Sequence, residues 1–301
     1  MKHIFVVNPA SGNGKNKKEL IDRITAAAAE AALDYSLYIT KHRGDGEAYV
    51  RSTASKGGRV RFYACGGDGT LNETVNGMAA YENAELTMIP AGRGNDFPRS
   101  FEHPDYFDNI HRQIRGKGRK IDLIRYNNRY CINMMNMGFD CAVVTNVEKW
   151  KNRPWMSGGL SYAISVGFTL LSLPMEEMTI SLDNGESYDG KYLLVALGNG
   201  GWYGGGYHAA PRARLDDGLM EVNLIKPVSR LTFVKLVGDY KAGKIYENPG
   251  VKNRLIYRQC KSLTLAPKQN TCLCVDGELE PVKEVKLELQ PKAVRFSVPK
   301  E

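Results

Sequence analysis

The chain has 301 residues, of which 43% are hydrophobic and 25% are charged. This length and composition fit a globular protein with enough apolar residues for two cores. They exclude a collagen, a disordered tail and a disulfide-stapled miniprotein. Lys and Arg outnumber Asp and Glu by 41 to 33, a formal net charge of +8. That charge favours an anionic partner: a nucleotide phosphate, a nucleic acid or an acidic membrane face.

The sequence shows no sign of export or membrane crossing. No secretory signal precedes the apolar run Ile4–Val7. The most apolar stretch, residues 160–173, is interrupted by Ser, Thr and Gly and is too short to cross a bilayer. The six cysteines have no metal-binding spacing. We therefore expect a reduced, cytoplasmic protein.

Strands and helices are expected to alternate along the first third of the chain. Continuous apolar runs predict buried strands at 4–7, 35–40, 60–64 and 86–89. Helices are expected at 17–33, 47–55, 70–80 and 105–115. Alternation of this kind predicts a doubly wound α/β domain with a parallel sheet, which we assign to residues 1–120. Its ligand should lie beyond the carboxyl ends of the strands.

The pattern changes near Lys120, where turn signals and apolar alternation predict a mainly antiparallel β-sandwich domain, residues 121–290. Asn127-Asn128 predicts a hairpin between strands 122–126 and 129–134, and Asp183-Asn184-Gly185 predicts one between 178–182 and 187–197. The remaining strands are expected at 219–225, 262–266, 271–275 and 285–298, and the helices at 140–151, 159–173 and 229–241. The last segment, about 290–301, is expected to pack back on the first domain.

Two glycine-rich turns follow predicted parallel strands. Gly66-Gly67-Asp68-Gly69-Thr70 opens a helix, and Gly92-Arg93-Gly94-Asn95-Asp96 follows the next strand. Glycine lets the backbone approach a phosphate, and the N–H groups at a helix start favour anions. An acidic residue beside a phosphate makes sense if Mg²⁺ stands between them. One such turn alone would be an ordinary capped turn, whereas two favour a nucleotide site.

Several segments together resemble the diacylglycerol kinase catalytic-domain family, which includes bacterial soluble lipid kinases, sphingosine kinases and ceramide kinases. They are Asn8-Pro9-Ala10-Ser11-Gly12, the GGDGT turn with Leu71-Asn72-Glu73, Gly94-Asn95-Asp96-Phe97, and segments 133–138, 210–218 and 276–278. The resemblance implies a first domain like that of NAD kinases and phosphofructokinases. It also implies ATP and Mg²⁺ as cofactors and a membrane lipid as substrate.

The resemblance also assigns residues to the nucleotide. It implies that ATP is held by Asn8, Ser11, Gly12, Thr40, Gly66, Gly67, Asp68, Gly69, Thr70, Leu71, Asn72, Arg93, Asn95 and Asp96. Asp68 and Asp96 would position Mg²⁺. The family usually has Thr where this chain has Arg93. The guanidinium group either contacts a phosphate or turns to solvent.

On propensity alone, Asp276-Gly277-Glu278 is a hairpin turn after strand 271–275. The resemblance implies catalytic roles here: Glu278 as the general base for the lipid hydroxyl, with Asp276 beside it and Asp68 in the same catalytic set. It further implies a structural Mg²⁺ bound by the carbonyls of Arg214 and Leu219 and the carboxylate of Asp217. A plain Asp-Gly turn is compatible with that loop.

Two segments could meet the lipid or its membrane. Lys149-Trp150-Lys151-Asn152-Arg153-Pro154-Trp155 suits an anionic bilayer surface and equally a solvated helix end. The loop 198–207, rich in Gly and aromatic residues, either frames a lipid cleft or is a plain surface loop.

The sequence thus predicts an ATP- and Mg²⁺-dependent lipid kinase that converts diacylglycerol to phosphatidic acid. It should contact anionic membranes peripherally and bind no nucleic acid, because no recognition module is present. A homodimer stays possible. The alternatives are an NAD kinase, which shares GGDGT, and a catalytically silent nucleotide-binding regulator.

Overall fold

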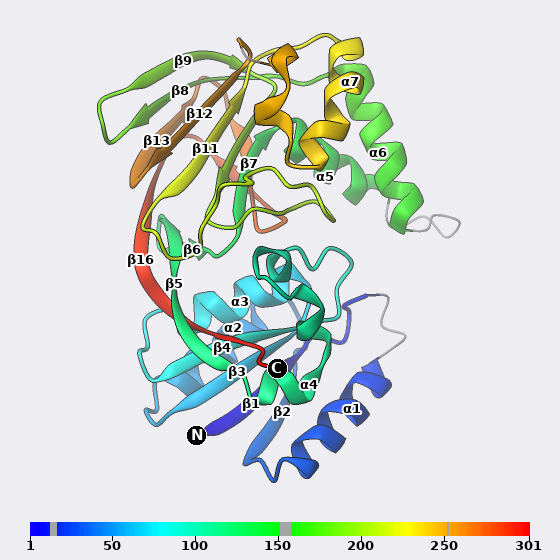
Figure 1. The fold of residues 1–301 in the computed structure, drawn as a ribbon, viewed down its shortest axis with the longest axis vertical. Coiled ribbons are helices and arrows are strands. Elements are labelled where there is room, and N and C mark those ends of the chain that lie inside the picture. The colour runs from blue at the N-terminus through cyan, green and yellow to red at the C-terminus, as the bar shows by residue number, and fades with distance from the viewer. Residues whose placement is uncertain (13–16, 151–157, 252) are drawn as a thin grey trace.

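The computed structural model describes residues 1–12, 17–150, 158–251 and 253–301. An N-terminal domain, blue to cyan in Figure 1, lies below a C-terminal domain drawn mainly in green, yellow and orange. Two long strands, β5 (Lys117–Tyr126) and β16 (Val285–Val298), join the domains along one edge of the molecule.

The other strands are β1 Lys2–Val7, β2 Tyr35–Ile39, β3 Val60–Gly66, β4 Ala84–Pro90, β6 Arg129–Cys131, β7 Met134–Gly138, β8 Glu176–Leu182, β9 Ser187–Tyr192, β10 Leu194–Gly198, β11 Met220–Ile225, β12 Leu255–Cys260, β13 Ser262–Pro267, β14 Thr271–Val275 and β15 Glu278–Val282. The helices are α1 Lys17–Glu30, α2 Asp45–Ala54, α3 Asp68–Met78, α4 Ile110–Ile114, α5 Phe139–Trp150, α6 Gly158–Ser172 and α7 Arg230–Lys241. Short 3₁₀ turns are η1 Phe97–Ser100, η2 Pro104–Asp108, η3 Ile245–Glu247 and η4 Pro249–Val251.

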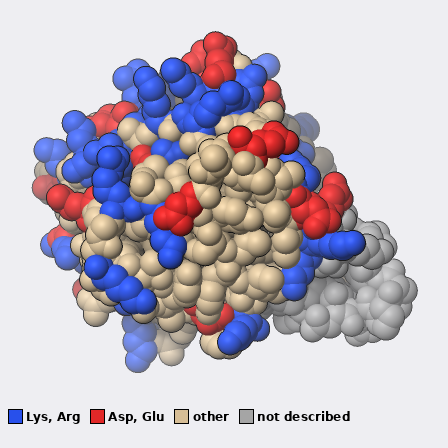
Figure 2. All heavy atoms as spheres, turned by 90° about the horizontal axis from the view of Figure 1, so that it is seen from below, with Lys and Arg blue, Asp and Glu red and all other residues tan. Residues whose placement is uncertain are grey.

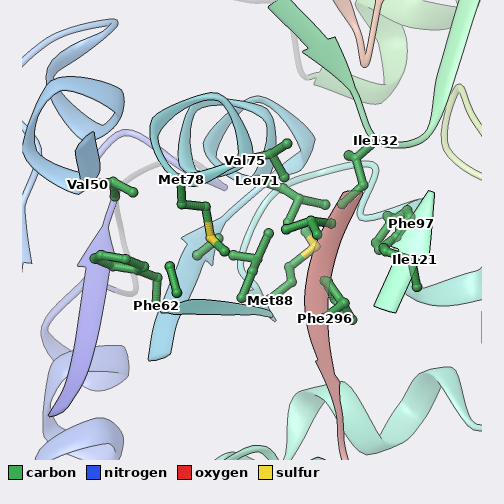
Figure 3. Close-up of a cluster of buried hydrophobic side chains, with 14 of the residues drawn as sticks. Val50, Phe62, Leu71, Val75, Met78, Met88, Phe97, Ile121, Ile132 and Phe296 are labelled. Carbon is green, nitrogen blue, oxygen red and sulfur yellow. The ribbon is translucent and has the colours of Figure 1, made fainter. Parts of the chain in front are cut away.

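The N-terminal sheet has parallel strands in the order β2-β1-β3-β4, with helices on both faces. Alternate residues of β1 supply two cores: Ile4 and Val6 face α2 and α3, whereas Phe5 and Val7 face α1 and α4. Figure 3 shows the first core, where Leu71 of α3 points down toward the sheet. The expected doubly wound domain is confirmed.

Strand β16 connects this sheet to the C-terminal domain. Phe296, near its end, pairs in parallel with Leu86 of β4, while most of β16 runs antiparallel to β5. The register shifts between Gln290 and Val294. Earlier in the strand, Leu287 pairs with Leu263 of β13, so one continuous sheet follows the order β2-β1-β3-β4-β16-β13-β8-β9.

The C-terminal domain is a sandwich of antiparallel strands. Its second sheet has the order β12-β11-β10-β7-β14-β15 and packs against β13, β8 and β9 of the first sheet. Buried side chains from both sheets fill the space between them, among them Ile180, Leu197, Val222 and Leu263. The expected antiparallel domain is confirmed. None of the described helices is long and apolar enough to cross a bilayer.

Three expectations about local structure are wrong. The single strand expected at 187–197 is two strands in different sheets. The chain turns the corner at Leu193, whose N–H donates to the Ile225 carbonyl at 2.8 Å. The helix expected at 105–115 is a 3₁₀ turn followed by the short α4. The extended residue Asn109 interrupts it and caps α4 by accepting from Arg112 N. The strand expected at 129–134 ends at Cys131.

The charges are distributed unevenly on the lower face of the N-terminal domain. Figure 2 shows Lys and Arg mainly toward the rim of this face, with Asp and Glu among them and a broad uncharged area beside them. The excess of basic residues is therefore not a single basic patch on this side of the molecule.

Candidate active site

The two glycine-rich turns touch each other backbone to backbone at the carboxyl ends of β3 and β4. A Cβ atom on Gly92 would lie 2.4 Å from Gly67 Cα, and one on Gly66 would lie 2.2 Å from Thr70 Oγ1. A side chain on Gly92 would push the two turns apart, and one on Gly66 would collide with Thr70 within its own turn, so close approach requires glycine at both positions. The two turns therefore form one surface of exposed backbone.

The first turn of the chain is tied to the start of α3. Asn8 donates from Nδ2 to Thr70 Oγ1 at 3.0 Å, and its Oδ1 accepts from Ala10 N at 3.0 Å. These residues line a cleft of about 980 Å³, which we call the glycine cleft. It brings together the predicted site residues Asn8, Ser11, Thr40, Gly67, Gly69, Thr70, Asn72 and Glu278.

A neighbouring cleft of about 760 Å³ lies between the domains, and we call it the carboxylate cleft. Its lining includes the predicted residues Gly12, Asp68, Arg93, Asp96 and Asp276. Arg93 is exposed at the edge of this cleft. Asn95, at φ +51°, holds the second turn closed: its Oδ1 accepts from Gly92 N at 3.0 Å.

Two predicted nucleotide contacts point elsewhere. The Leu71 side chain is 1% exposed and packs in the core (Figure 3), while its N–H donates to the Gly67 carbonyl. Asn72 borders the glycine cleft, yet its amide is engaged at the domain junction, donating to Asp276 Oδ2 at 2.7 Å and to Tyr130 O at 3.1 Å. The GGDGT signature thus also contains residues that serve packing.

Asp68 and Asp96 form a pair of carboxyl groups at the start of α3. Asp68 accepts from Asn95 N at 3.0 Å and from Asp96 N at 3.1 Å. Desolvation, together with the nearby Asp96 charge, raises the pKa of Asp68 to about 6. Burial also raises the pKa of Asp96, although Gly205 N donates to its Oδ2 at 2.7 Å.

These two carboxyl groups suit a divalent cation. Asp96 Oδ1 is buried, accepts no hydrogen bond from the described residues, and lies 3.5 Å from Arg99 Nε. A cation would offset both the desolvation and the Asp96 charge that raise the pKa of Asp68, and it would use this oxygen. No three His, Cys, Asp or Glu side chains converge as metal ligands in the described part of the chain. The remaining ligands would therefore be carbonyl, water or phosphate oxygens.

The Asp276 carboxylate is saturated with hydrogen bonds. Oδ1 accepts from the backbone N–H groups of Asn133 and Met134, each at 3.0 Å, and from the Cys131 thiol at 3.1 Å. Oδ2 accepts from Ile132 N at 3.0 Å and from Asn72. These bonds use the N–H groups between β6 and β7 and fix the junction.

Asp276 and Gly277 are also the two turn residues of the β14–β15 hairpin, with φ of +47° and +92°. Positive φ at both residues is the pattern that Asp-Gly favours in a two-residue hairpin. The turn places Glu278 over the start of α3: its Oε1 lies 3.1 Å from where a Cβ on Gly69 would stand. Its Oε2 pairs with Arg43 Nη2 at 3.1 Å, and the side chain is 46% exposed.

The loop predicted to bind a structural Mg²⁺ is held by its own contacts. Asp217 Oδ1 accepts from Leu219 N at 3.0 Å, and Arg214 lies earlier in the same loop. Asp122, which the sequence did not single out, anchors the loop because its carboxyl accepts from Gly218 N at 2.8 Å and Lys292 N at 2.6 Å. Burial raises the pKa of Asp122.

Sequence reasoning also missed a buried polar cluster beside the carboxylate cleft. Tyr203 donates to Asp140, and the hydroxyls of Tyr203 and Tyr240 lie 3.1 Å apart. Burial raises the pKa of Asp140 to about 7. Asp140 follows a buried strand end, which is a usable signal, but its tyrosine partners lie 63 positions or more away.

An apolar cavity of about 70 Å³ continues from this cluster between α5, α6 and α7. It shares Asp140, Val143, Tyr203 and Tyr207 with the carboxylate cleft. Part of the loop 198–207 therefore frames the cleft. The basic and tryptophan-containing segment 149–155 lies outside the residues whose side chains are described.

The fold is that of lipid kinases. Residues 2–126 match the family described as diacylglycerol kinase catalytic domain, and residues 133–298 match the YegS C-terminal NAD kinase beta sandwich-like domain. The chain belongs to the diacylglycerol kinase family, which confirms the resemblance and makes it a lipid kinase. Kinases of this family use ATP.

Relatives match nearly the whole chain. Proteins named diacylglycerol kinase from Staphylococcus aureus strains RF122 and MRSA252 are each 30% identical over 277 residues, 91% of this chain and 85% of theirs. A Bacillus anthracis crystal structure named as a candidate diacylglycerol kinase has a TM-score of 0.76 at 25% identity. The match covers 98% of this chain and 94% of that one.

Proposed function

We propose that the protein transfers the γ-phosphoryl group of ATP to the hydroxyl of membrane diacylglycerol, giving phosphatidic acid. The position of Glu278 carries this proposal. A carboxylate from the C-terminal domain faces the glycine-rich helix start of the N-terminal domain, with Oε1 3.1 Å from the Cβ position of Gly69. A proton acceptor beside a phosphate turn is the arrangement that phosphoryl transfer to an alcohol needs.

The glycine cleft would hold the phosphates of ATP. The N–H groups at the start of α3 point away from the helix and favour anions there. Asn8 keeps this start in place through Thr70. Mg²⁺ held by Asp68 and Asp96 would neutralise phosphate charge when bound. Arg93, exposed at the neighbouring cleft, is proposed as a further phosphate contact.

Glu278 would take the proton of the lipid hydroxyl as the oxygen attacks the γ-phosphorus and ADP leaves. Its ion pair with Arg43 joins two side chains that are 72% and 46% exposed, so it contributes little to stability. The ion pair instead orients the Glu278 carboxylate. Asp276 holds the hairpin that carries Glu278, and we assign it a positioning role.

The acyl part of the lipid would use the apolar cavity between α5, α6 and α7, widening it on binding. The cluster of Asp140, Tyr203 and Tyr240 stands between this cavity and the carboxylate cleft. A polar glycerol group at this boundary would find donors and acceptors. We also retain the structural Mg²⁺ at the 214–219 loop and peripheral binding to anionic membranes as proposals.

The test is transfer of labelled phosphate from ATP to a panel of acceptors in mixed micelles. The panel contains diacylglycerol, ceramide, sphingosine, a polyprenol and NAD. We expect labelled phosphatidic acid, and Glu278→Gln should lower kcat by about 10²–10⁴ without unfolding the protein. Glu284→Gln, which makes the same charge change on the exposed turn after β15, is the matched control.

Other outcomes would contradict the proposal in identifiable ways. Labelling of another lipid instead of diacylglycerol would support lipid kinase activity but contradict diacylglycerol as the substrate. Labelling of NAD alone would indicate an NAD kinase. ATP binding without labelling of any acceptor would indicate a silent nucleotide-binding regulator.

A further inference from the structure

The outer face of α6 and α7 exposes large apolar side chains. Leu171 at the end of α6 is 66% exposed, and Leu231 and Val234 of α7 are 78% and 57% exposed. Leu231 and Val234 are three residues apart and share one helix face. Single exposed apolar residues need no explanation, but a group on adjoining helices marks an interaction surface.

The two helices are joined where these residues lie. Arg230 Nε donates to the carbonyls of Leu170 at 3.3 Å and Leu171 at 3.2 Å, so the end of α6 meets the start of α7. Ser229 caps α7 by accepting from Thr232 N at 3.2 Å. Phe168 on α6 and Met175 just after it are also exposed, at 50% and 41%. Exposed apolar side chains therefore stand on both helices, whose end (α6) and start (α7) meet at Arg230.

The inner side of the same helices lines the apolar cavity. Val166 of α6 and Phe233, Leu236 and Val237 of α7 contribute to that lining. The helix pair is thus apolar on two sides, toward the cavity and toward solvent. A helix pair of this kind can lie in a bilayer interface, where only its own side chains would separate the membrane from the apolar cavity.

The charges beside the face favour an anionic surface. Lys235, next to Val234, is exposed, and Arg230 is exposed at the end of the face. Each cation near an anionic leaflet contributes about 1 kcal/mol to binding. Of the two acidic residues that follow Met175, Glu176 is half-buried, and Glu177 is exposed but paired with Lys268 at 3.1 Å. Cations and apolar residues together select a lipid surface over a purely apolar protein partner.

We propose that the α6–α7 face docks on a bilayer that contains anionic lipid, with Leu171, Leu231 and Val234 entering the headgroup region. Docking there places the apolar cavity against the membrane. The lipid acceptor would leave the bilayer between the helices. This last step rests on the proposed phosphoryl transfer, whereas the docking deepens the proposed peripheral membrane binding and can be tested without transfer.

Binding to vesicles tests the docking without ATP or an acceptor. Vesicles of equal parts phosphatidylcholine and phosphatidylglycerol are sedimented with the native protein and with the Leu231→Ser, Val234→Ser double variant. We expect the partition coefficient to fall about 10-fold or more, because two apolar side chains lose their burial. Ile39→Ser, at an exposed apolar residue of β2 with 39% exposure, is the control and should bind normally.

Three results would overturn the proposal: absence of native binding, binding of the double variant as tight as native, or an equal fall in the Ile39→Ser control. A change in oligomeric state of the double variant in solution, with vesicle binding intact, would show a contact between two copies instead.

A kinase assay separates failure of docking from failure of the proposed function. A short-chain diacylglycerol that dissolves as monomers needs no membrane docking. The double variant should phosphorylate it at the native rate and lose activity only on vesicle-embedded diacylglycerol. If the native protein phosphorylates neither, the proposed function fails while the vesicle-binding result still decides the docking. An equal loss on both acceptors would contradict a role of the face in membrane access.

Discussion

The amide of Asn72 donates to the carboxylate of Asp276 at 2.7 Å and joins two residues 204 positions apart in the sequence. One lies on α3, immediately after the phosphate turn, and the other lies in the β14–β15 turn. Glu278, the proposed base, lies two residues further along the chain. The Asn72–Asp276 hydrogen bond therefore fixes the position of Glu278 relative to the start of α3. Asp276 therefore links the geometry of the two domains.

Asp276→Asn should destabilise the protein by about 3 kcal/mol, because an amide cannot accept from all of the buried donors that now meet the carboxylate. Thermal unfolding measures this. Asp183→Asn is the matched control, since its carboxylate also accepts from two backbone N–H groups but is exposed, and it should cost less than about 1 kcal/mol. Lost kinase activity with an unchanged Tm would make Asp276 a catalytic residue instead.

Gly92→Ala should weaken ATP binding by about 10-fold or more, because its Cβ would lie 2.4 Å from Gly67 Cα and force the two turns apart. Isothermal titration with ATP measures the loss. Gly238→Ala in α7 has open space around its Cβ. This control should keep native ATP affinity and gain up to about 1 kcal/mol of stability. Native affinity in Gly92→Ala would show that the turns can separate freely.

Ionisation of Asp68 should lower the free energy of unfolding of the metal-free protein as the pH rises from about 4 to about 6. The folded-state pKa of Asp68, about 6, lies above its usual value of 3.8. Within this window the folded state keeps a proton that the unfolded state has lost, and this contribution disappears above the folded pKa.

A divalent cation should reverse this penalty, because it binds the ionised carboxyl and competes with the proton. Mg²⁺ with ATP should therefore raise the Tm more at about pH 7.5 than at about pH 5. In Asp68→Asn this pH dependence should shrink. A Tm shift of equal size at both pH values in the native protein would argue against Asp68 as a ligand.

Tyr203→Phe should raise the KM for the lipid acceptor several-fold and leave the KM for ATP unchanged. The substitution removes the donor to Asp140 at the boundary between the apolar cavity and the carboxylate cleft. Steady-state kinetics with both substrates checks this. Tyr188→Phe, which removes a tyrosine donor to Glu186 on the remote β8–β9 hairpin, is the control. A rise in the KM for ATP alone would place Tyr203 in the nucleotide site.

The sequence predicted the fold class well because β1 and β3 are apolar on both faces, which only a sheet covered on both sides allows. It failed at Leu193 because apolar alternation continues through the corner, so the pattern cannot show that a strand changes sheet. Strand β12 was also missed, since polar residues interrupt Leu255–Cys260. A local sequence pattern predicts a strand or helix but does not predict which strand it pairs with.

The site divides in the same way. The glycines and Asp68 could be predicted because close backbone approach requires glycine, and this produces a recognisable glycine-rich turn around Asp68. The tyrosine partners of Asp140 and the anchoring role of Asp122 could not be predicted, because residues that are far apart in the sequence form no local motif. Leu71 lies inside a signature and still faces the core, since a helix that begins at a phosphate must also pack on its sheet.

The late position of β16 in the sequence has a consequence for folding during synthesis. During synthesis, β1 to β4 leave the ribosome well before β16, the strand that pairs with the edge of β4, because the strands β5 to β15 lie between them in the sequence. Phe296, fully buried in the N-terminal core, is synthesised only after the other strands of the C-terminal domain. The nascent N-terminal domain therefore keeps an open edge and an incomplete core until β16 has been synthesised.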